Sequence, residues 1–223
     1  MAGNICIQNP WPGFMQTIWG DPERFIDTYF AQYCKDRSSK DWRDWPYVTG
    51  DGAMQSADGY FRIVGRVDDV INVAGHRLGT KELESAALTV ESVGEAAAVP
   101  AFDDLRGRVP EMYISLKPGF VDDGKAAADV TAALRQIIGP IAKPAHVWVT
   151  EDLPKTRSGK IMRRVIASIS NFMDVGDTTT LANPEVVEDI RVQVQMQKAR
   201  DGEVPSAISS EMAEEIRRFG DDG

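Results

Sequence analysis

The sequence is poor in the residues that build metal clusters and disulfide frameworks. It has only two cysteines, Cys6 and Cys34, and only two histidines among 223 residues. The cysteines lack metal-ligand spacing, which argues against a zinc or iron–sulfur site and indicates a reducing compartment. No apolar run approaches the length of a transmembrane helix, and the N-terminus has no signal-peptide pattern. We therefore expect a cytoplasmic protein with no membrane partner.

Basic residues are also in deficit. The chain has 25 Lys and Arg against 34 Asp and Glu, which gives a formal net charge of −9 and a pI of about 4.8. Nucleic acid and anionic membrane surfaces repel a chain of this charge. The hydrophobic content of 43% is typical of a globular fold. We therefore expect a globular protein with no nucleic-acid partner.

One stretch departs from this acidic background. Residues 153–164, "LPKTRSGKIMRR", contain five basic residues: Lys155, Arg157, Lys160, Arg163 and Arg164. Three interpretations are open: a solvated helix face, a site for a small anion such as phosphate or carboxylate, and a nucleic-acid patch. We expect a helix to start within "KIMRRVIASI", with Ser158 as its N-cap.

Two upstream loops carry further polar residues in glycine-rich surroundings. Asp51 lies between Gly50 and Gly52, after an aromatic and β-branched strand. It is either a turn aspartate that bonds local amides or a carboxylate that accepts two ribose hydroxyls. In "GRVDDVINVAGHRLGT", Arg66 and Arg77 suit bidentate contact with phosphate or carboxylate.

Three motifs occur in a fixed order: "TGDG" at 49–52, "GRVDDVINVAGHRLGTKELE" at 65–84, and the basic stretch at 153–164. In this order they resemble the C-terminal third of AMP-forming acyl-CoA synthetases, and most of all the acetyl-CoA synthetases and their short-chain relatives. The resemblance runs from about residue 4 to residue 190.

The resemblance implies roles for single residues. Asp51 holds the nucleotide ribose, Arg66 contacts the nucleotide, and Arg77 contacts a phosphate. Lys160 is the lysine of the adenylation step and also a target of reversible acylation. Asp68 is the hinge between two domains.

The same resemblance implies a coenzyme A site and raises a metal site. Ala74 approaches coenzyme A through its backbone, Gly75 allows that approach, and Arg135 meets a coenzyme A phosphate. A histidine that sometimes takes part in a metal site in the family corresponds to Val90 here. A valine side chain cannot ligate, so no metal site is expected.

The predicted fold class is α+β. We expect a β-rich remnant of a large adenylation domain over residues 1–66, in which "WPYVTGDGAMQSADGYFRIVGR" forms a hairpin with Asp58-Gly59 as its turn. A hinge at 67–68 leads to a mobile C-terminal domain over 69–170, a short sheet with helices on one face. Residues 171–223 are expected to form an extension that packs back on this domain, and its helical part is either a surface helix or an oligomer contact.

The implied substrates are ATP as its Mg²⁺ complex, a short-chain carboxylate and coenzyme A. The Ser/Thr/Gly-rich triphosphate loop of such enzymes does not occur in these 223 residues. We therefore expect a fragment that needs a missing N-terminal domain as its partner and is inactive alone. The alternative is a non-catalytic binding or regulatory module that lysine acyltransferases and deacylases modify.

Overall fold

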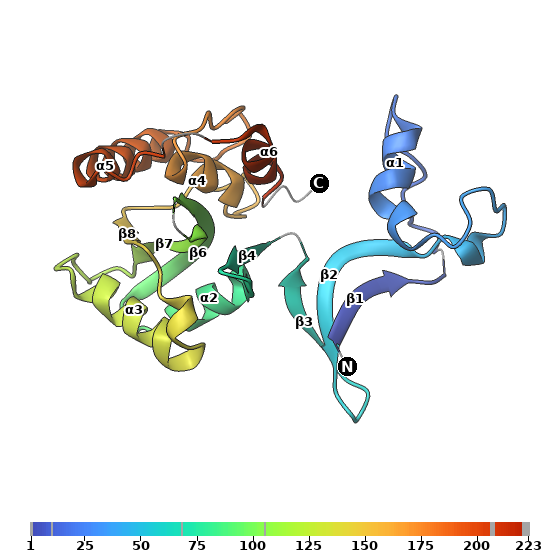
Figure 1. Cartoon of the computed structure of the whole chain (residues 1–223), viewed down its shortest axis with the longest axis horizontal. Helices are drawn as coiled ribbons and strands as arrows, with labels where there is room; N and C mark the ends of the chain where they lie inside the picture. The colour runs from blue at the N-terminus through green and yellow to red at the C-terminus, as the bar shows by residue number, and fades with distance from the viewer. Residues whose placement is uncertain (1, 10, 68, 105, 206–207, 220–223) are drawn as a thin grey trace. The chain divides into compact units, whose positions relative to one another are not determined.

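A computed structural model describes residues 2–9, 11–67, 69–104, 106–205 and 208–219 (Figure 1). The chain divides into two compact units, Met1–Val67 and Asp68–Gly223. The predicted hinge residue, Asp68, lies outside the described residues. No helix in the described ranges combines the length and apolar character that crossing a membrane requires.

The first unit is built on an antiparallel sheet of order β1-β2-β3, formed by Ala2–Ile7, Tyr47–Gln55 and Phe61–Arg66. The predicted hairpin is confirmed. Its turn is closed by the Ser56 amide, which donates to the carbonyl oxygen of Tyr60 at 2.9 Å, and Gly59 supplies the positive φ of 90° that the turn requires.

Helical segments of the first unit lie between β1 and β2. Helix α1 (Pro22–Tyr29) begins after Asp21, whose carboxylate accepts the Arg24 amide at 3.0 Å. Pro22 fits the first turn because a backbone N–H at that position would have no carbonyl partner within the helix, so proline loses no hydrogen bond there. Two 3₁₀ turns, η1 and η2, follow at Ala31–Tyr33 and Trp42–Asp44.

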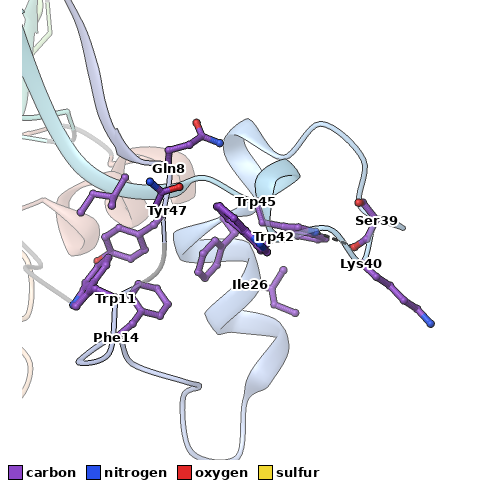
Figure 2. Close-up of a pocket in the computed structure, with 12 residues that line it drawn as sticks. Gln8, Trp11, Phe14, Ile26, Ser39, Lys40, Trp42, Trp45 and Tyr47 are labelled. Atoms are coloured by element: carbon purple, nitrogen blue, oxygen red, sulfur yellow. Dashed lines mark hydrogen bonds between the residues drawn. The ribbon is translucent and has the colours of Figure 1, made fainter.

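Aromatic side chains of the first unit gather around an open pocket of about 340 Å³. Figure 2 shows the rings of Trp11, Phe14 and Tyr47 close together, with the side chain of Lys40 directed away from them. Among the described residues of this unit, the buried hydrophobic side chains are Phe25, Val48 and Ala53. The first unit therefore encloses little core of its own.

The second unit contains two sheets and six helical segments within its described residues. β4 and β5 form a short hairpin, and β6, β7 and β8 form a sheet of that order, antiparallel between β6 and β7 and parallel between β7 and β8. The elements are β4 (Val70–Val73), β5 (His76–Gly79), α2 (Thr80–Ala87), β6 (Val93–Asp103), β7 (Gly107–Leu116), α3 (Lys125–Ile137), η3 (Pro140–Ala142), β8 (Val147–Thr150), α4 (Arg163–Ser170), α5 (Glu185–Asp201) and α6 (Ser210–Arg218).

Helices cover both faces of the β6-β7-β8 sheet, so the predicted one-sided arrangement is wrong. Figure 1 shows α2 and α3 on one side of this sheet and α4 and α5 on the other. Residues 109–115 of β7 are buried without alternation. Continuous burial of this kind is typical of a strand that has both faces of its sheet covered. The α+β class itself is confirmed.

Large apolar side chains of the second unit pack into its core. Met112 and Trp148 are buried, and Met162 is half-buried against the same core. Trp148 also donates its indole N–H to Glu111 Oε2 at 3.1 Å. Its polar edge is therefore satisfied inside the core.

Helix α5 is more than the surface helix that the sequence predicted. Its side chains Val187, Ile190 and Val194 are buried. Lys198 is buried too, and its Nζ lies 2.5 Å from Glu111 Oε1 and donates to the Ser170 carbonyl oxygen at 2.7 Å. The extension therefore shares the core of the second unit.

The buried carboxylate of Glu111 is held by a chain of hydroxyls as well as by Lys198. Ser170 Oγ donates to Glu111 Oε2 at 2.9 Å and lies 2.6 Å from the Tyr113 hydroxyl. Burial, together with the charge of Glu111, holds the pKa of Tyr113 well above its ordinary value. The phenol therefore stays neutral and can donate its proton toward Ser170.

We expect Lys198→Met to lower the free energy of unfolding of the second unit by about 3–5 kcal/mol, because it leaves Glu111 buried without its cation. The double variant Glu111→Gln/Lys198→Met should recover part of that loss. Hydrogen exchange of β6 and β7 amides measures this unit separately. Lys125→Met, at an exposed pair with Asp129, is the matched control. Equal losses for Lys198→Met and the control would contradict the prediction.

Candidate functional site: a lysine hairpin and two glycine-rich turns

The basic stretch folds as a tight hairpin, residues 154–162, called here the lysine hairpin. Lys155 and Ile161 form an antiparallel bridge, and the Thr156 amide donates to the Lys160 carbonyl oxygen at 2.8 Å. The Met162 amide donates to the Pro154 carbonyl oxygen at 2.8 Å. The backbone of the hairpin therefore satisfies much of its own hydrogen bonding and presents Lys160 on a defined turn.

A helix does start within "KIMRRVIASI", as expected, but the prediction of Ser158 as its N-cap is wrong. Helix α4 begins at Arg163, and its N-cap position, Met162, makes no side-chain cap bond. The Ser158 hydroxyl instead lies 2.9 Å from the Thr156 hydroxyl, and Thr156 Oγ1 accepts the Lys160 amide at 3.1 Å. Both hydroxyls therefore form hydrogen bonds within the hairpin, ahead of the start of α4.

The five basic residues separate into an inward set and an outward set. Arg163 is buried and makes a bidentate pair with Glu84, with Nε–Oε1 at 2.6 Å and Nη2–Oε2 at 2.8 Å. Arg164 donates to the Val175 carbonyl oxygen at 3.0 Å. The five basic residues therefore do not form one continuous solvated face. The basic residues exposed at the tip are Arg157 and Lys160.

Lys155, the remaining inward residue, bridges two acids. Its Nζ lies 2.7 Å from both Glu95 Oε2 and Asp152 Oδ1. Burial lowers the pKa of Lys155, but hydrogen bonds to Asp152 and Glu95 outweigh it and hold that pKa above its ordinary value. Burial likewise raises the pKa of Asp152, yet hydrogen bonds from Lys155 and other donors hold it below its ordinary value.

The pH range of this bridge follows from these directions. The contribution of Asp152 to stability is lost as pH falls through its lowered pKa, and that of Lys155 is lost as pH rises through its raised pKa. Both groups are therefore charged throughout the neutral range.

A two-residue turn, Ala74 and Gly75, joins β4 to β5, and the third predicted site residue of this hairpin, Arg77, follows in β5. Val73 pairs with His76 across it, and both turn residues have positive φ, 47° at Ala74 and 86° at Gly75. Such a pair of angles is typical of a type I′ hairpin turn. Ala74, Gly75, His76 and Arg77 are all exposed, so a ligand can reach both the turn backbone and the Arg77 guanidinium.

Asp51 and Arg66 lie directly opposite each other in the β2–β3 pair. Gly50 has a φ of +77°, and a Cβ there would lie 3.2 Å from the Arg66 guanidinium. Glycine is therefore required both by the backbone angle and by the close approach of Arg66. The structure brings a carboxylate and a guanidinium together at a half-buried strand end.

The other predicted site positions lie in the second unit. Arg135 is exposed in the last turn of α3. Val90 follows α2, and its half-buried side chain packs against the hydrophobic core. Within the described ranges, no three His, Cys, Asp or Glu side chains gather closely enough to hold a metal ion.

The structure therefore groups the candidates by unit. Asp51 and Arg66 lie together in the first unit, and Ala74, Gly75, Arg77, Arg135 and Lys160 belong to the second.

Sequence reasoning missed the residues that fix the lysine hairpin, Glu84, Arg163 and Asn183. Arg163 was counted with the basic cluster, and Glu84 lies 79 residues away from it in the chain. Asn183 precedes Pro184, a pattern that suggests only a helix start. No local signal identifies a partner at such a separation.

The fold and the two exposed turns agree with a defined domain class. Residues 82–160 match the family model described as the AMP-binding enzyme C-terminal domain. The match begins in α2 and ends at Lys160. A solved anthranilate CoA ligase in complex with anthranoyl-AMP shares the fold, with a TM-score of 0.62 and 25% identity over 76% of this chain and 30% of that chain.

Curated relatives extend the similarity beyond that domain. Acetyl-coenzyme A synthetase of Leptospira biflexa is 45% identical over 192 residues, 85% of this chain and 28% of the relative. That of Rhizobium meliloti is 47% identical over 190 residues, 84% of this chain and 28% of the relative. This chain thus spans less than a third of their length. Over most of its length the chain is similar to acetyl-coenzyme A synthetases, and its residues 82–160 match the C-terminal domain of AMP-binding enzymes, which confirms the resemblance of the motifs.

Proposed function

We propose that this chain is part of an enzyme that converts acetate or a similar short-chain acid, ATP and coenzyme A into acyl-CoA, AMP and pyrophosphate. The observation that carries the proposal is the lysine hairpin, which presents Lys160 on an exposed turn closed by its own hydrogen bonds. The identity of 45% to an acetyl-coenzyme A synthetase supports acetate as the first substrate to test. The low cysteine content supports a cytoplasmic location.

Lys160 is proposed to act in the first half-reaction. A carboxylate oxygen of the acid attacks the α-phosphorus of ATP, and the bond from that phosphorus to the pyrophosphate oxygen breaks. The carboxylate is already ionised, so no general base is needed. Negative charge builds around the reacting phosphate, and an ammonium group placed there stabilises it most where water is excluded.

Asp51, Arg66 and Arg77 are proposed to hold the nucleotide. A carboxylate can accept hydrogen bonds from both ribose hydroxyls, and a guanidinium can bind phosphate oxygens in pairs. The opposed positions of Asp51 and Arg66 support a shared ligand at that strand end. Mg²⁺ would enter with the triphosphate of ATP.

The β4–β5 turn is proposed to serve the second half-reaction. The coenzyme A sulfur bonds to the acyl carbon, the bond from that carbon to the AMP oxygen breaks, and the thiol proton passes to solvent. Ala74 and Gly75 suit close passage of a ligand along the backbone, and Arg135 suits a phosphate of coenzyme A. Rotation about Asp68 would bring the lysine hairpin and this turn to the reaction in succession.

The second candidate is a non-catalytic module that lysine acyltransferases and deacylases modify. The exposure of Lys160 at a hairpin tip favours it, because a modifying enzyme must reach the ammonium group. Acylation there would remove the positive charge of the side chain. One protein can have both functions. In the absence of acyltransferases and deacylases, however, only the first candidate predicts catalysis by the protein itself.

We expect the 223-residue chain alone to show no acetate-dependent ATP–pyrophosphate exchange, because it lacks a Ser/Thr/Gly-rich triphosphate loop. The full-length gene product should catalyse the exchange. Radioactive pyrophosphate incorporated into ATP measures both. Exchange by the isolated chain would contradict its dependence on further residues. A full-length product that is acylated at Lys160 but never catalyses exchange would favour the module.

A further inference from the structure

The N-terminal arm of the lysine hairpin is held by a segment that follows α4 in the chain. Thr156 and Leu181 form an antiparallel bridge. The Ala182 amide donates to the Lys155 carbonyl oxygen at 2.8 Å. Residues 181–183 thus pair with the hairpin as a short third strand. Leu181 itself is buried in the core of the second unit, so this segment is anchored independently of the hairpin.

The side-chain amide of Asn183 makes three hydrogen bonds to this arm. Its Oδ1 accepts the Lys155 amide at 2.9 Å. Its Nδ2 donates to Asp152 Oδ2 and to the Leu153 carbonyl oxygen, both at 2.9 Å. An amide is the group that can accept and donate twice in this way. One side chain therefore fixes Asp152, Leu153 and Lys155, which lie on both sides of Pro154 and ahead of the hairpin turn.

The opposite arm is fixed by a different device. Arg163 follows the hairpin directly and is locked in its buried pair with Glu84. The Glu84 carboxylate also accepts the Ala98 amide at 3.2 Å, which ties this anchor to β6. The position of Lys160 is therefore set from both sides, by Arg163 after the hairpin and by Asn183 before it.

We propose that Asn183 is a positioning residue for Lys160, acting through the N-terminal arm of the lysine hairpin. The proposal rests on the proposed function, since it concerns the same lysine. The three hydrogen bonds of the Asn183 side chain all go to residues other than Lys160. Its effect is geometric, because displacing a charged group by about 1 Å from a reacting phosphate can lower the rate on the order of 10²-fold.

The test is Asn183→Ala in the full-length gene product. We expect acetate-dependent ATP–pyrophosphate exchange to fall roughly 10- to 100-fold. Formation of acetyl-CoA from supplied acetyl-adenylate and coenzyme A should stay within about twofold, because Lys160 serves the first half-reaction alone. Backbone amides of Lys155 and Thr156 should also exchange hydrogen faster.

Gln193→Ala is the matched control. Gln193 lies in the same extension and donates its side-chain amide to the Val149 carbonyl oxygen at 3.0 Å, away from the hairpin. It should leave both half-reactions unchanged. If Asn183→Ala shifts the unfolding midpoint more than this control does, Asn183→Asp replaces it. Aspartate keeps the acceptor for Lys155 but has no N–H for Asp152 or Leu153, so the first half-reaction should again fall selectively.

Two results would overturn the proposal. One is unchanged exchange in both Asn183 variants while Lys160→Ala abolishes exchange, which leaves the proposed function standing. The other is an equal fall of both half-reactions, which marks Asn183 as merely structural. If Lys160→Ala itself retains exchange, the proposed function fails first and the role of Asn183 fails with it.

Discussion

Acetate-dependent ATP–pyrophosphate exchange should fall by about 10²- to 10³-fold when Lys160 is replaced by Ala in the full-length gene product, a loss typical of removing one preorganised electrostatic contact. Acetyl-CoA formation from supplied acetyl-adenylate should persist. The reason is that charge at the α-phosphate develops in the first half-reaction, whereas the second displaces AMP from a carbonyl carbon. Rapid-quench assays of each half-reaction measure the two rates separately.

The control for this variant is Lys125→Ala. Lys125 is an exposed lysine at the start of α3 and pairs with Asp129. It therefore reports any general effect of removing a lysine from the second unit. Both half-reactions should keep the wild-type rate in this control. A Lys160→Ala enzyme with the exchange rate of the control would show that Lys160 is not the adenylation lysine.

Arg163→Ala should destabilise the second unit by about 3–5 kcal/mol, the range for breaking a buried ion pair at one partner. The loss arises because Glu84 stays buried, with the Ala98 amide and Lys81 Nζ, at 3.4 Å from Oε2, as its remaining partners. The stability of the Arg163→Lys variant should lie between those of the wild type and Arg163→Ala, since a lysine cannot make both hydrogen bonds of the guanidinium.

Hydrogen exchange of buried amides in β6 and β7 gives the free energy of unfolding of this unit. The control is Arg191→Ala, which removes an exposed pair with Glu188 on α5. It should have no measurable effect, because exposed ion pairs contribute little. A loss for Arg163→Ala no larger than that of the control would contradict the buried-anchor account of the lysine hairpin.

Some elements have limits that are set by signals within a few residues of the chain. Asp21 and Pro22 indicate the start of α1, and Asp58 with Gly59 indicates the β2–β3 turn. Gly139, with a φ of +128°, and Pro140 follow the end of α3. Each signal is a capping bond, a fixed φ or a left-handed angle, and none depends on distant parts of the chain.

The lysine hairpin shows where such signals compete. Ser158 is a good N-cap type, and the residues after it favour a helix. The structure instead closes a turn from Thr156 to Lys160, because the Thr156 hydroxyl and carbonyl bond amides within the turn. Whether a hydroxyl caps a helix or closes a turn is decided by tertiary contacts such as the Arg163–Glu84 pair. The partners in such contacts are too far apart in the chain for local sequence to show them.

The sequence motifs located the residues of the candidate site. They did not reveal the buried residues that hold those site residues in place. The motifs identified Lys160, the Ala74–Gly75 turn and the Asp51–Arg66 pair. The Glu111–Lys198 and Glu84–Arg163 pairs were missed because charged residues are expected at the surface, and burial reverses that expectation only when the partner is known. Asn183 was missed because its three hydrogen bonds all go to residues 28 to 31 positions earlier in the chain.

The most direct test of the central claim is acetate- and coenzyme A-dependent release of AMP by the full-length gene product. The proposed function predicts one AMP and one pyrophosphate for each acetyl-CoA formed, and loss of AMP release in Lys160→Ala. Acetyl-CoA formation that releases ADP and phosphate, or AMP release that Lys160→Ala leaves unchanged, would contradict it.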